Sequence, residues 1–177
     1  FLAADDPNYC LSYYNARSSG KKLDLHIDSH IPYISDYTFS LQFTFLLEDS
    51  YIKNGCTTAV PGSHKSGKFT DRNITKLEHL SGNSGDLLIW DSRLWHGTNE
   101  NINRVSRWAI IATMTSWWLK PAVDIVRSID KNIYSKCNKR QKQLLGFCAI
   151  PPKNIYERNN TKNGYDFLKK DLKDYNI

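Results

Sequence analysis

The chain has 177 residues, of which 40% are hydrophobic and 12% aromatic, and its formal net charge is +6. These values fit one globular domain with a buried core and exclude an intrinsically disordered chain. No apolar stretch approaches the length of about 20 residues that a membrane-spanning helix requires.

The positive charge lies in the C-terminal third of the chain. From Lys120 onward there are 13 Lys and Arg against 6 Asp and Glu, a net charge of +7, which leaves −1 for the remainder. Such a surface can attract an anionic substrate, a nucleic acid or a membrane. The basic residues are scattered, however, and no aromatic residues are interleaved with them as in RNA-binding motifs. We therefore interpret them as a solvated helical surface and expect neither nucleic acid nor membrane as a partner.

The cysteines show no spacing typical of a metal site; they are Cys10, Cys56, Cys137 and Cys148. The sequence contains no signal-peptide pattern. We therefore expect free thiols in a reducing compartment, the cytoplasm.

Short strands are predicted for the first two thirds of the chain, after a polar lead-in over residues 1–20. Alternating or short apolar runs predict them at 23–28, 40–47, 56–60, 87–91 and 108–115. A loop region fills 62–84, with a possible helical turn around 75–77. Helical or irregular segments follow at 122–126 and 132–145, and a terminal helix is predicted over 165–172.

Two histidines and one aspartate form the main candidate site. His26 and Asp28 share one face of the strand predicted at 23–28. His96 follows the strand at 87–91 and stands 68 residues after Asp28. Two imidazoles and one carboxylate are the facial triad that holds iron(II) and leaves three coordination positions open. Such a long separation would be unusual for a zinc finger, whose ligands lie close together in sequence.

An arginine completes the pattern. Arg107 follows His96 by eleven residues and opens the strand predicted at 108–115. Its planar fork can bind the carboxylate of an organic acid at two points. Two alternatives stay open: Arg107 pairs with a structural carboxylate, or the neighbouring Arg104 takes its place.

One rival motif suggests a nucleotide-binding loop. Residues 62–68 match the spacing G-x-x-x-x-G-K, and the strand at 87–91 ends in an aspartate. A phosphate-binding loop requires Ser or Thr next, to hold magnesium, but Phe69 stands there. The flanks also lack alternating strands and helices, so a turn is the better interpretation.

The ordered motifs of the chain resemble those of the phytanoyl-CoA dioxygenase family. The matching pieces, over about residues 20–120, are His26-Ile27-Asp28, Asn54-Gly55, Pro61-Gly62-Ser63-His64, Gly85-Asp86 and His96-Gly97-Thr98-Asn99-Glu100-Asn101 through Arg107; Leu144-Leu145-Gly146-Phe147 is similar to a C-terminal family motif. The resemblance implies a mainly β fold, a double-stranded β-helix (jelly roll, cupin-like), with C-terminal helices.

The resemblance also implies cofactors and a reaction. Iron(II) would be held by His26, Asp28 and His96, and 2-oxoglutarate would be bound by Arg107 with Thr98 and Thr44. Oxygen would be consumed with release of succinate and carbon dioxide, and a small-molecule substrate would be hydroxylated. Asp28 favours hydroxylation, because related halogenases have a small residue at that position.

Several expectations remain general. We expect one domain over 1–177 that lacks its N-terminal part, with core motifs at 20–120 and a helical region at 121–177. His30 is expected at the surface or in the substrate pocket, and His64 either near the pocket or in a turn. The five tryptophans are expected to pack in the core. The alternative function is a non-catalytic metal-binding jelly roll or an inactive oxygenase remnant; the substrate and the oligomeric state are not defined by the sequence.

Overall fold

The computed structural model describes residues 9–18, 20–71, 73–74, 76–151 and 155–157. The terminal helix predicted at 165–172 lies outside these residues. Contacts divide the chain into two compact units, Tyr14–Thr113 and a second unit of Phe1–Tyr13 with Met114–Ile177. The single-domain expectation stays a prediction.

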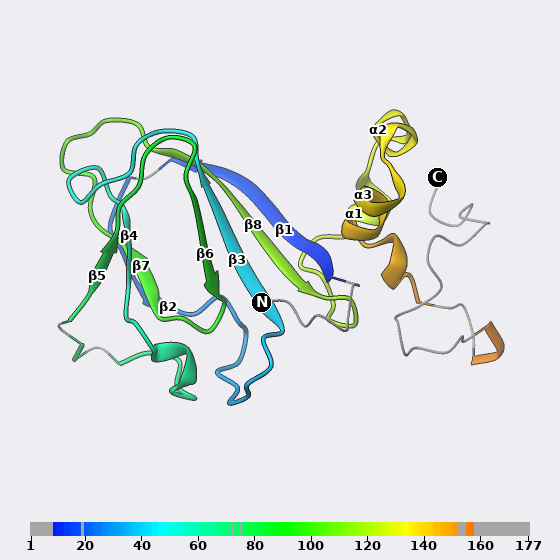
Figure 1. The fold of residues 1–177 in the computed structure, drawn as a ribbon, viewed down its shortest axis with the longest axis horizontal. Helices are drawn as coiled ribbons and strands as arrows, with labels where there is room; N and C mark the ends of the chain where they lie inside the picture. The colour runs from blue at the N-terminus through cyan, green and yellow to red at the C-terminus, as the bar shows by residue number, and fades with distance from the viewer. Residues whose placement is uncertain (1–8, 19, 72, 75, 152–154, 158–177) are drawn as a thin grey trace. The chain divides into compact units, whose positions relative to one another are not determined.

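Two four-stranded sheets form the β core (Figure 1). The first has the order β1 (Tyr9–Ser18), β8 (Trp108–Ser116), β3 (Ser40–Leu46) and β6 (Leu87–Asp91). The second has the order β2 (Leu23–His26), β7 (His96–Thr98), β4 (Thr57–Ala59) and β5 (Glu78–Leu80). The pairs β2–β7, β3–β6, β4–β5 and β4–β7 are antiparallel. The predicted double-stranded β-helix is confirmed.

Alternation along β3 sets which side chains face the interior. Gln42 and Thr44 are 2% exposed, whereas Phe45 between Thr44 and Leu46 is 44% exposed. Opposite them on β6, Trp90 pairs with Gln42 and Leu88 pairs with Thr44. Because side chains alternate along a strand, these four residues project from the same, inner face of the first sheet.

Three strands were not predicted, and one of them is β7 at His96–Thr98. β1 occupies Tyr9–Ser18, where the sequence indicated only a polar lead-in. Its side chains are buried mainly in the first half of the strand, so no alternation extends over its length. β5, at Glu78–Leu80, has only three residues, too few for a periodic signal.

Several predicted segments also differ from the observed ones. The strand predicted over 23–28 ends at His26, so Asp28 lies beyond it. The helical turn expected around 75–77 is absent from the described residues there; a 3-10 helix, η1, occupies Ser63–Lys65 instead. The helical segment at 132–145 is two helices, α2 (Lys131–Lys136) and α3 (Lys139–Leu144).

The second unit carries the described α-helices. Besides α2 and α3 it contains α1 (Ile125–Ser128) and the 3-10 helices η2 (Phe147–Ala149) and η3 (Ile155–Glu157). Asp130 caps α2, and Asn138 caps α3 with a capping box. Phe147 and Ile150 form the buried centre, with Val126, Ile129, Tyr134 and Leu145 packed around them. None of the helices in the described residues is long and apolar enough to cross a membrane.

The structure records no disulfide among Cys10, Cys56, Cys137 and Cys148, all of which are described residues.

Candidate metal centre

His26 is the last residue of strand β2, and a backbone carbonyl of the same strand orients its ring. Its Nδ1 lies 2.9 Å from the carbonyl oxygen of Asp24, two residues earlier. A ring nitrogen that donates to a carbonyl fixes the tautomer and leaves Nε2 as the ligand atom. The β2–β7 pairing sets His26 opposite His96, so the two imidazoles come from neighbouring strands.

His96 has the same arrangement at the start of β7. Its Nδ1 lies 2.9 Å from the Leu94 carbonyl oxygen, again two residues earlier. The side chain is buried, and its ring centroid lies 4.3 Å from that of His26. Both rings therefore present Nε2 to the same place.

Asp28 faces both imidazoles. One carboxylate oxygen lies 3.2 Å from Nε2 of His96, and the other lies 3.6 Å from Nε2 of His26. Burial alone would raise the pKa of Asp28, but its contacts with His26 and His96 outweigh this and hold the pKa well below its usual range. The same contact with Asp28 raises the pKa of His26, against the effect of burial.

The three groups together form a candidate metal site. Their ligand atoms all lie within 4.8 Å of one another. The structure thus brings together the residues that the sequence analysis selected, although 68 residues separate Asp28 from His96. His30 and His64 are not members of this cluster; His30 is exposed, and His64 lies half-buried in η1.

The backbone of Ser92 holds Asp28 in place. Its carbonyl oxygen accepts hydrogen bonds from the amides of Asp28 and Ser29, each 2.9 Å long. Ser92 is itself fixed to β3, because its amide donates to the Ser40 carbonyl over 3.1 Å and the two hydroxyls lie 2.8 Å apart. Asp28 therefore needs no strand pairing of its own to keep its position.

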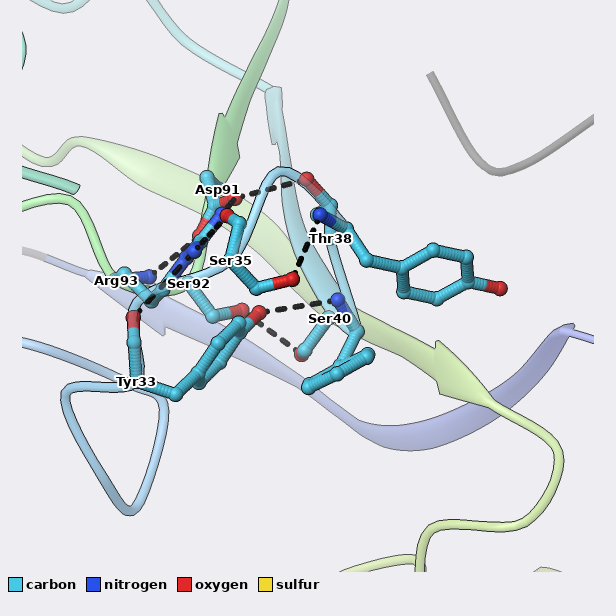
Figure 2. A network of polar contacts seen from close by, with 9 residues as sticks. Tyr33, Ser35, Thr38, Ser40, Asp91, Ser92 and Arg93 are labelled. Atoms are coloured by element: carbon cyan, nitrogen blue, oxygen red, sulfur yellow. Dashed lines mark hydrogen bonds and ion pairs between the residues drawn. The ribbon is translucent and has the colours of Figure 1, made fainter. Parts of the chain in front are cut away.

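A buried ion pair next to Ser92 fixes the loop between Asp28 and β3 (Figure 2). Nε and Nη2 of Arg93 donate to the two carboxylate oxygens of Asp91 over 2.9 and 2.7 Å. Nη1 donates to the carbonyl of Ser35 over 2.8 Å, and the guanidinium carbon lies 4.2 Å from the centroid of the Tyr33 ring. Thr38 donates its hydroxyl hydrogen to Asp91 over 3.0 Å. The guanidinium thus joins the end of β6 to residues 33–38.

The Pro-Gly-Ser-His segment supports the neighbouring strand. Ser63 accepts a hydrogen bond of 2.8 Å from the amide of Trp95, the residue before His96. Trp95 Nε1 donates to the carbonyl of Lys68 over 3.0 Å. The segment forms a three-residue 3-10 helix and leads to no α-helix, which disagrees with a phosphate-binding loop.

Arg107 is buried, and one of its guanidinium nitrogens lacks an acceptor among the described residues. The residue is 7% exposed, and its Nε has no hydrogen-bond partner among the described residues. Burial lowers the pKa of the guanidinium, and the nearby Cys56 thiol opposes this effect. Arg104 is exposed and has a positive φ of 54°. This geometry favours Arg107 over Arg104 as the group that binds an anion in the interior.

The two threonines differ. Thr44 is 2% exposed, and its hydroxyl has no partner among the described residues. The Thr98 hydroxyl accepts a hydrogen bond of 3.1 Å from the amide of Leu23, so it also holds β2 against β7. Thr44 is available to a ligand, whereas Thr98 is already engaged as an acceptor.

Sequence reasoning missed two features of the site. The ion pair of Arg93 with Asp91 depends on a loop conformation that no periodicity predicts. Trp90 was expected to pack in the core, and it is buried. Its ring centroid lies 5.2 Å from that of His96, with an interplanar angle of 55°. Its Nε1, however, is an unpartnered donor within the described part of the chain. Only coordinates could distinguish it from the other four tryptophans.

The sequence model of the phytanoyl-CoA dioxygenase family matches residues 4–109. The chain belongs to this family. The phytanoyl-CoA dioxygenase motifs identified in the sequence thus lie largely within the matched region.

Curated relatives include two proteins named as dioxygenases. The chain is 29% identical to the uncharacterized protein Rv1501 of Mycobacterium tuberculosis over 129 residues, which are 70% of this chain and 46% of that protein. It is 29% identical to Dioxygenase ALT11 of Alternaria alternata over 63% of this chain and 38% of that protein. Phytanoyl-CoA dioxygenase 1 of Oryza sativa is 36% identical over 80 residues, 36% of this chain and 28% of that protein. The matched region spans less than half the length of these relatives.

Solved structures show the same fold. The non-heme monooxygenase ThoJ has a TM-score of 0.56 at 18% identity, covering 67% of this chain and 50% of that one. EctD from S. alaskensis has a TM-score of 0.54 at 19% identity, covering 65% and 49%. HygX from Streptomyces hygroscopicus, solved with nickel, 2-oxoglutarate and hygromycin B, has a TM-score of 0.54 at 18% identity, covering 64% and 58%.

Proposed function

We propose that the chain is the core of an iron(II)- and 2-oxoglutarate-dependent dioxygenase that hydroxylates a small molecule. The convergence of His26, Asp28 and His96 on one point carries this proposal. Membership of the phytanoyl-CoA dioxygenase family supports it.

The donor set fits the metal. An octahedral site with bonds of about 2.1 Å needs neighbouring ligand atoms about 3 Å apart. One carboxylate oxygen of Asp28 lies 3.2 Å from Nε2 of His96, close to this value, and one ligand atom from each of the three residues lies within 4.8 Å of the others. Two neutral imidazoles and one carboxylate also match the ligand set of non-haem iron(II) oxygenases. When bound, iron(II) with 2-oxoglutarate would supply oxygen activation coupled to oxidative decarboxylation of the 2-oxo acid to succinate and carbon dioxide.

Interior donors would bind and orient the 2-oxo acid. Arg107 would bind the far carboxylate, since its buried Nε has no acceptor of its own within the described residues. Thr44 would donate its free hydroxyl hydrogen to the same ligand. Thr98 would add a weaker contact, because its oxygen already accepts from Leu23.

Succinate release tests the proposal. Purified chain with iron(II), 2-oxoglutarate and oxygen should form succinate slowly even without a prime substrate, and omission of iron should stop it. Asp28→Ala should abolish hydroxylation and weaken iron(II) binding, because the site then has only two protein ligands. Arg107→Ala should raise the apparent KM for 2-oxoglutarate at least tenfold, whereas the exposed Arg104→Ala should not. An unchanged KM in Arg107→Ala means that the co-substrate is bound elsewhere.

A non-catalytic metal-binding jelly roll is the alternative. It predicts tight iron binding with no succinate release under any condition.

HygX, a protein of the same fold, was solved with hygromycin B bound, which supports a small molecule as the substrate class. The cytoplasmic location stays a prediction.

A further inference from the structure

Trp90 carries a buried donor that the protein itself does not use. The residue is 9% exposed, and its Nε1 has no hydrogen-bond partner among the residues the structure describes. An indole nitrogen can only donate, and an unpaired buried donor costs stability. Trp95 shows the ordinary arrangement, because its Nε1 donates to the Lys68 carbonyl over 3.0 Å. A ligand that accepts from Trp90 would explain the difference.

Trp90 lies beside the metal site. Its ring centroid is 5.2 Å from that of His96, at an interplanar angle of 55°. On the inner face of the first sheet, Trp90 is opposite Gln42, and the next inward pair is Leu88 with Thr44. Thr44 is therefore one inward position further along β3 than Gln42, the residue that faces Trp90.

Three unpartnered donors follow this inner face. The Leu47 amide donates to the Trp108 carbonyl over 2.9 Å, which sets Arg107 beside the end of β3, beyond Thr44. The Thr44 hydroxyl and Arg107 Nε are unpartnered in the described chain, as is Trp90 Nε1. The order from the metal outward is thus Trp90, Thr44, Arg107. A dicarboxylate bound at one end to the metal and at the other to Arg107 would meet all three.

We propose that Trp90 donates its indole hydrogen to the carboxylate of the 2-oxo acid that chelates the metal beside His96. This inference rests on the proposed function. It adds a ligand-binding residue at the metal end of the site, opposite the end held by Arg107. Trp90 would contribute to the binding of any 2-oxo acid, with or without a second carboxylate.

Binding without turnover tests this. Under anaerobic conditions with iron(II), the visible absorption of the iron–2-oxo acid chelate reports binding of 2-oxoglutarate. Trp90→Phe keeps the aromatic ring and should raise the Kd about tenfold. Phe also fills less of the buried space than Trp, so the Tm of the metal-free variant should fall, but by less than for a Trp whose donor has an acceptor. Trp95→Phe is the matched control: its Tm should fall further and its Kd should stay unchanged.

Pyruvate distinguishes the two ends of the site. It has the same chelating carboxylate but lacks the far carboxylate that Arg107 would bind. Trp90→Phe should weaken pyruvate binding by the same factor as 2-oxoglutarate binding, whereas Arg107→Ala should affect 2-oxoglutarate far more. A loss for 2-oxoglutarate alone would overturn the placement of Trp90 at the metal end.

The wild-type chain offers a second measurement that needs no folded variant. With the indole nitrogens labelled with 15N, adding 2-oxoglutarate to the metal-loaded protein should move one buried indole N–H signal strongly downfield. No moved signal, or an equal Kd for wild type and Trp90→Phe, overturns the Trp90 assignment. Failure of the wild type to bind any 2-oxo acid overturns the proposed function, and the inference with it.

Discussion

The guanidinium of Arg93 forms a bidentate ion pair with the carboxylate of Asp91, with Nε 2.9 Å and Nη2 2.7 Å from its two oxygens. Both side chains are largely buried, with 4% and 12% of their surface exposed. Between them in sequence stands Ser92, whose carbonyl accepts from the amide of Asp28. The ion pair therefore fixes the peptide that positions a candidate metal ligand.

Removing the guanidinium should cost both stability and metal affinity. Arg93→Ala leaves the Asp91 carboxylate buried without its partner, and we expect the free energy of unfolding to fall by about 3 kcal/mol. Denaturant titration measures this loss, and iron(II) titration should show weaker binding as Asp28 loses its fixed position. The control is Arg127→Ala, which breaks an exposed pair with Asp124 and should cost under about 1 kcal/mol. Equal losses in the two variants would contradict a structural role for Arg93.

The same pair predicts an acid dependence of stability. Burial alone would raise the pKa of Asp91, but its hydrogen bonds with Arg93 outweigh this and lower the pKa from its usual value. A carboxyl whose folded-state pKa is lowered stabilises the fold above its unfolded pKa and loses this contribution as the pH falls through the folded value. Asp91→Asn should therefore be less stable than wild type at pH 7, and the gap should narrow below about pH 4. A gap that is constant from pH 7 to pH 2.5 would mean that the carboxylate charge is not involved.

The candidate ligands could be selected from the sequence, because the spacing of histidine and aspartate around apolar strands is a linear pattern. His26 was predicted inside a strand over 23–28, but the observed strand ends at His26. His96 was predicted to follow the strand at 87–91, whereas it begins β7, and the structure pairs it with His26 across β2 and β7. The position of Asp28 was predicted for a different reason from the one observed. It does not extend the strand, and it is held by two amides that donate to Ser92.

What the sequence could not predict depends on tertiary contacts. β1 alternates too weakly to signal a strand, since its second half is mostly exposed. Trp90 and Trp95 both follow apolar residues in the sequence. The Lys68 carbonyl accepts from Nε1 of Trp95, whereas Nε1 of Trp90 has no acceptor among the described residues. Periodicity predicts which face is buried, and it carries no information on which buried polar atom lacks a partner.

A substitution at Gly97 tests how closely strands β2 and β7, which carry His26 and His96, must approach each other. A Cβ added there would press against the carbonyl oxygen of Leu23 and lie 3.2 Å from that of Asp24. The Asp24 carbonyl orients the His26 ring, so Gly97→Ala should displace His26 and weaken iron(II) binding at least tenfold. Calorimetric titration with iron(II), or with a redox-inert divalent metal, measures the change. Gly20→Ala meets nothing within 4 Å and should bind metal as wild type does. Unchanged affinity in Gly97→Ala would show that the ligand strands adjust at little cost.

Thr44 separates the effect of a buried hydroxyl on stability from its effect on binding. Thr44→Val replaces a hydroxyl that has no partner among the described residues with a methyl group of similar size. Relief of the unpaired group should leave the unfolding free energy of the metal-free protein unchanged or raise it by about 1 kcal/mol. If the hydroxyl binds the 2-oxo acid, the KM for 2-oxoglutarate should rise several-fold while the Tm does not fall. Ser50→Ala is the matched control, since its buried hydroxyl is also unpartnered in the described chain but is not part of β3, β6 or β8. A fall in stability without a change in KM would show that Thr44 packs the interior and does not bind the ligand.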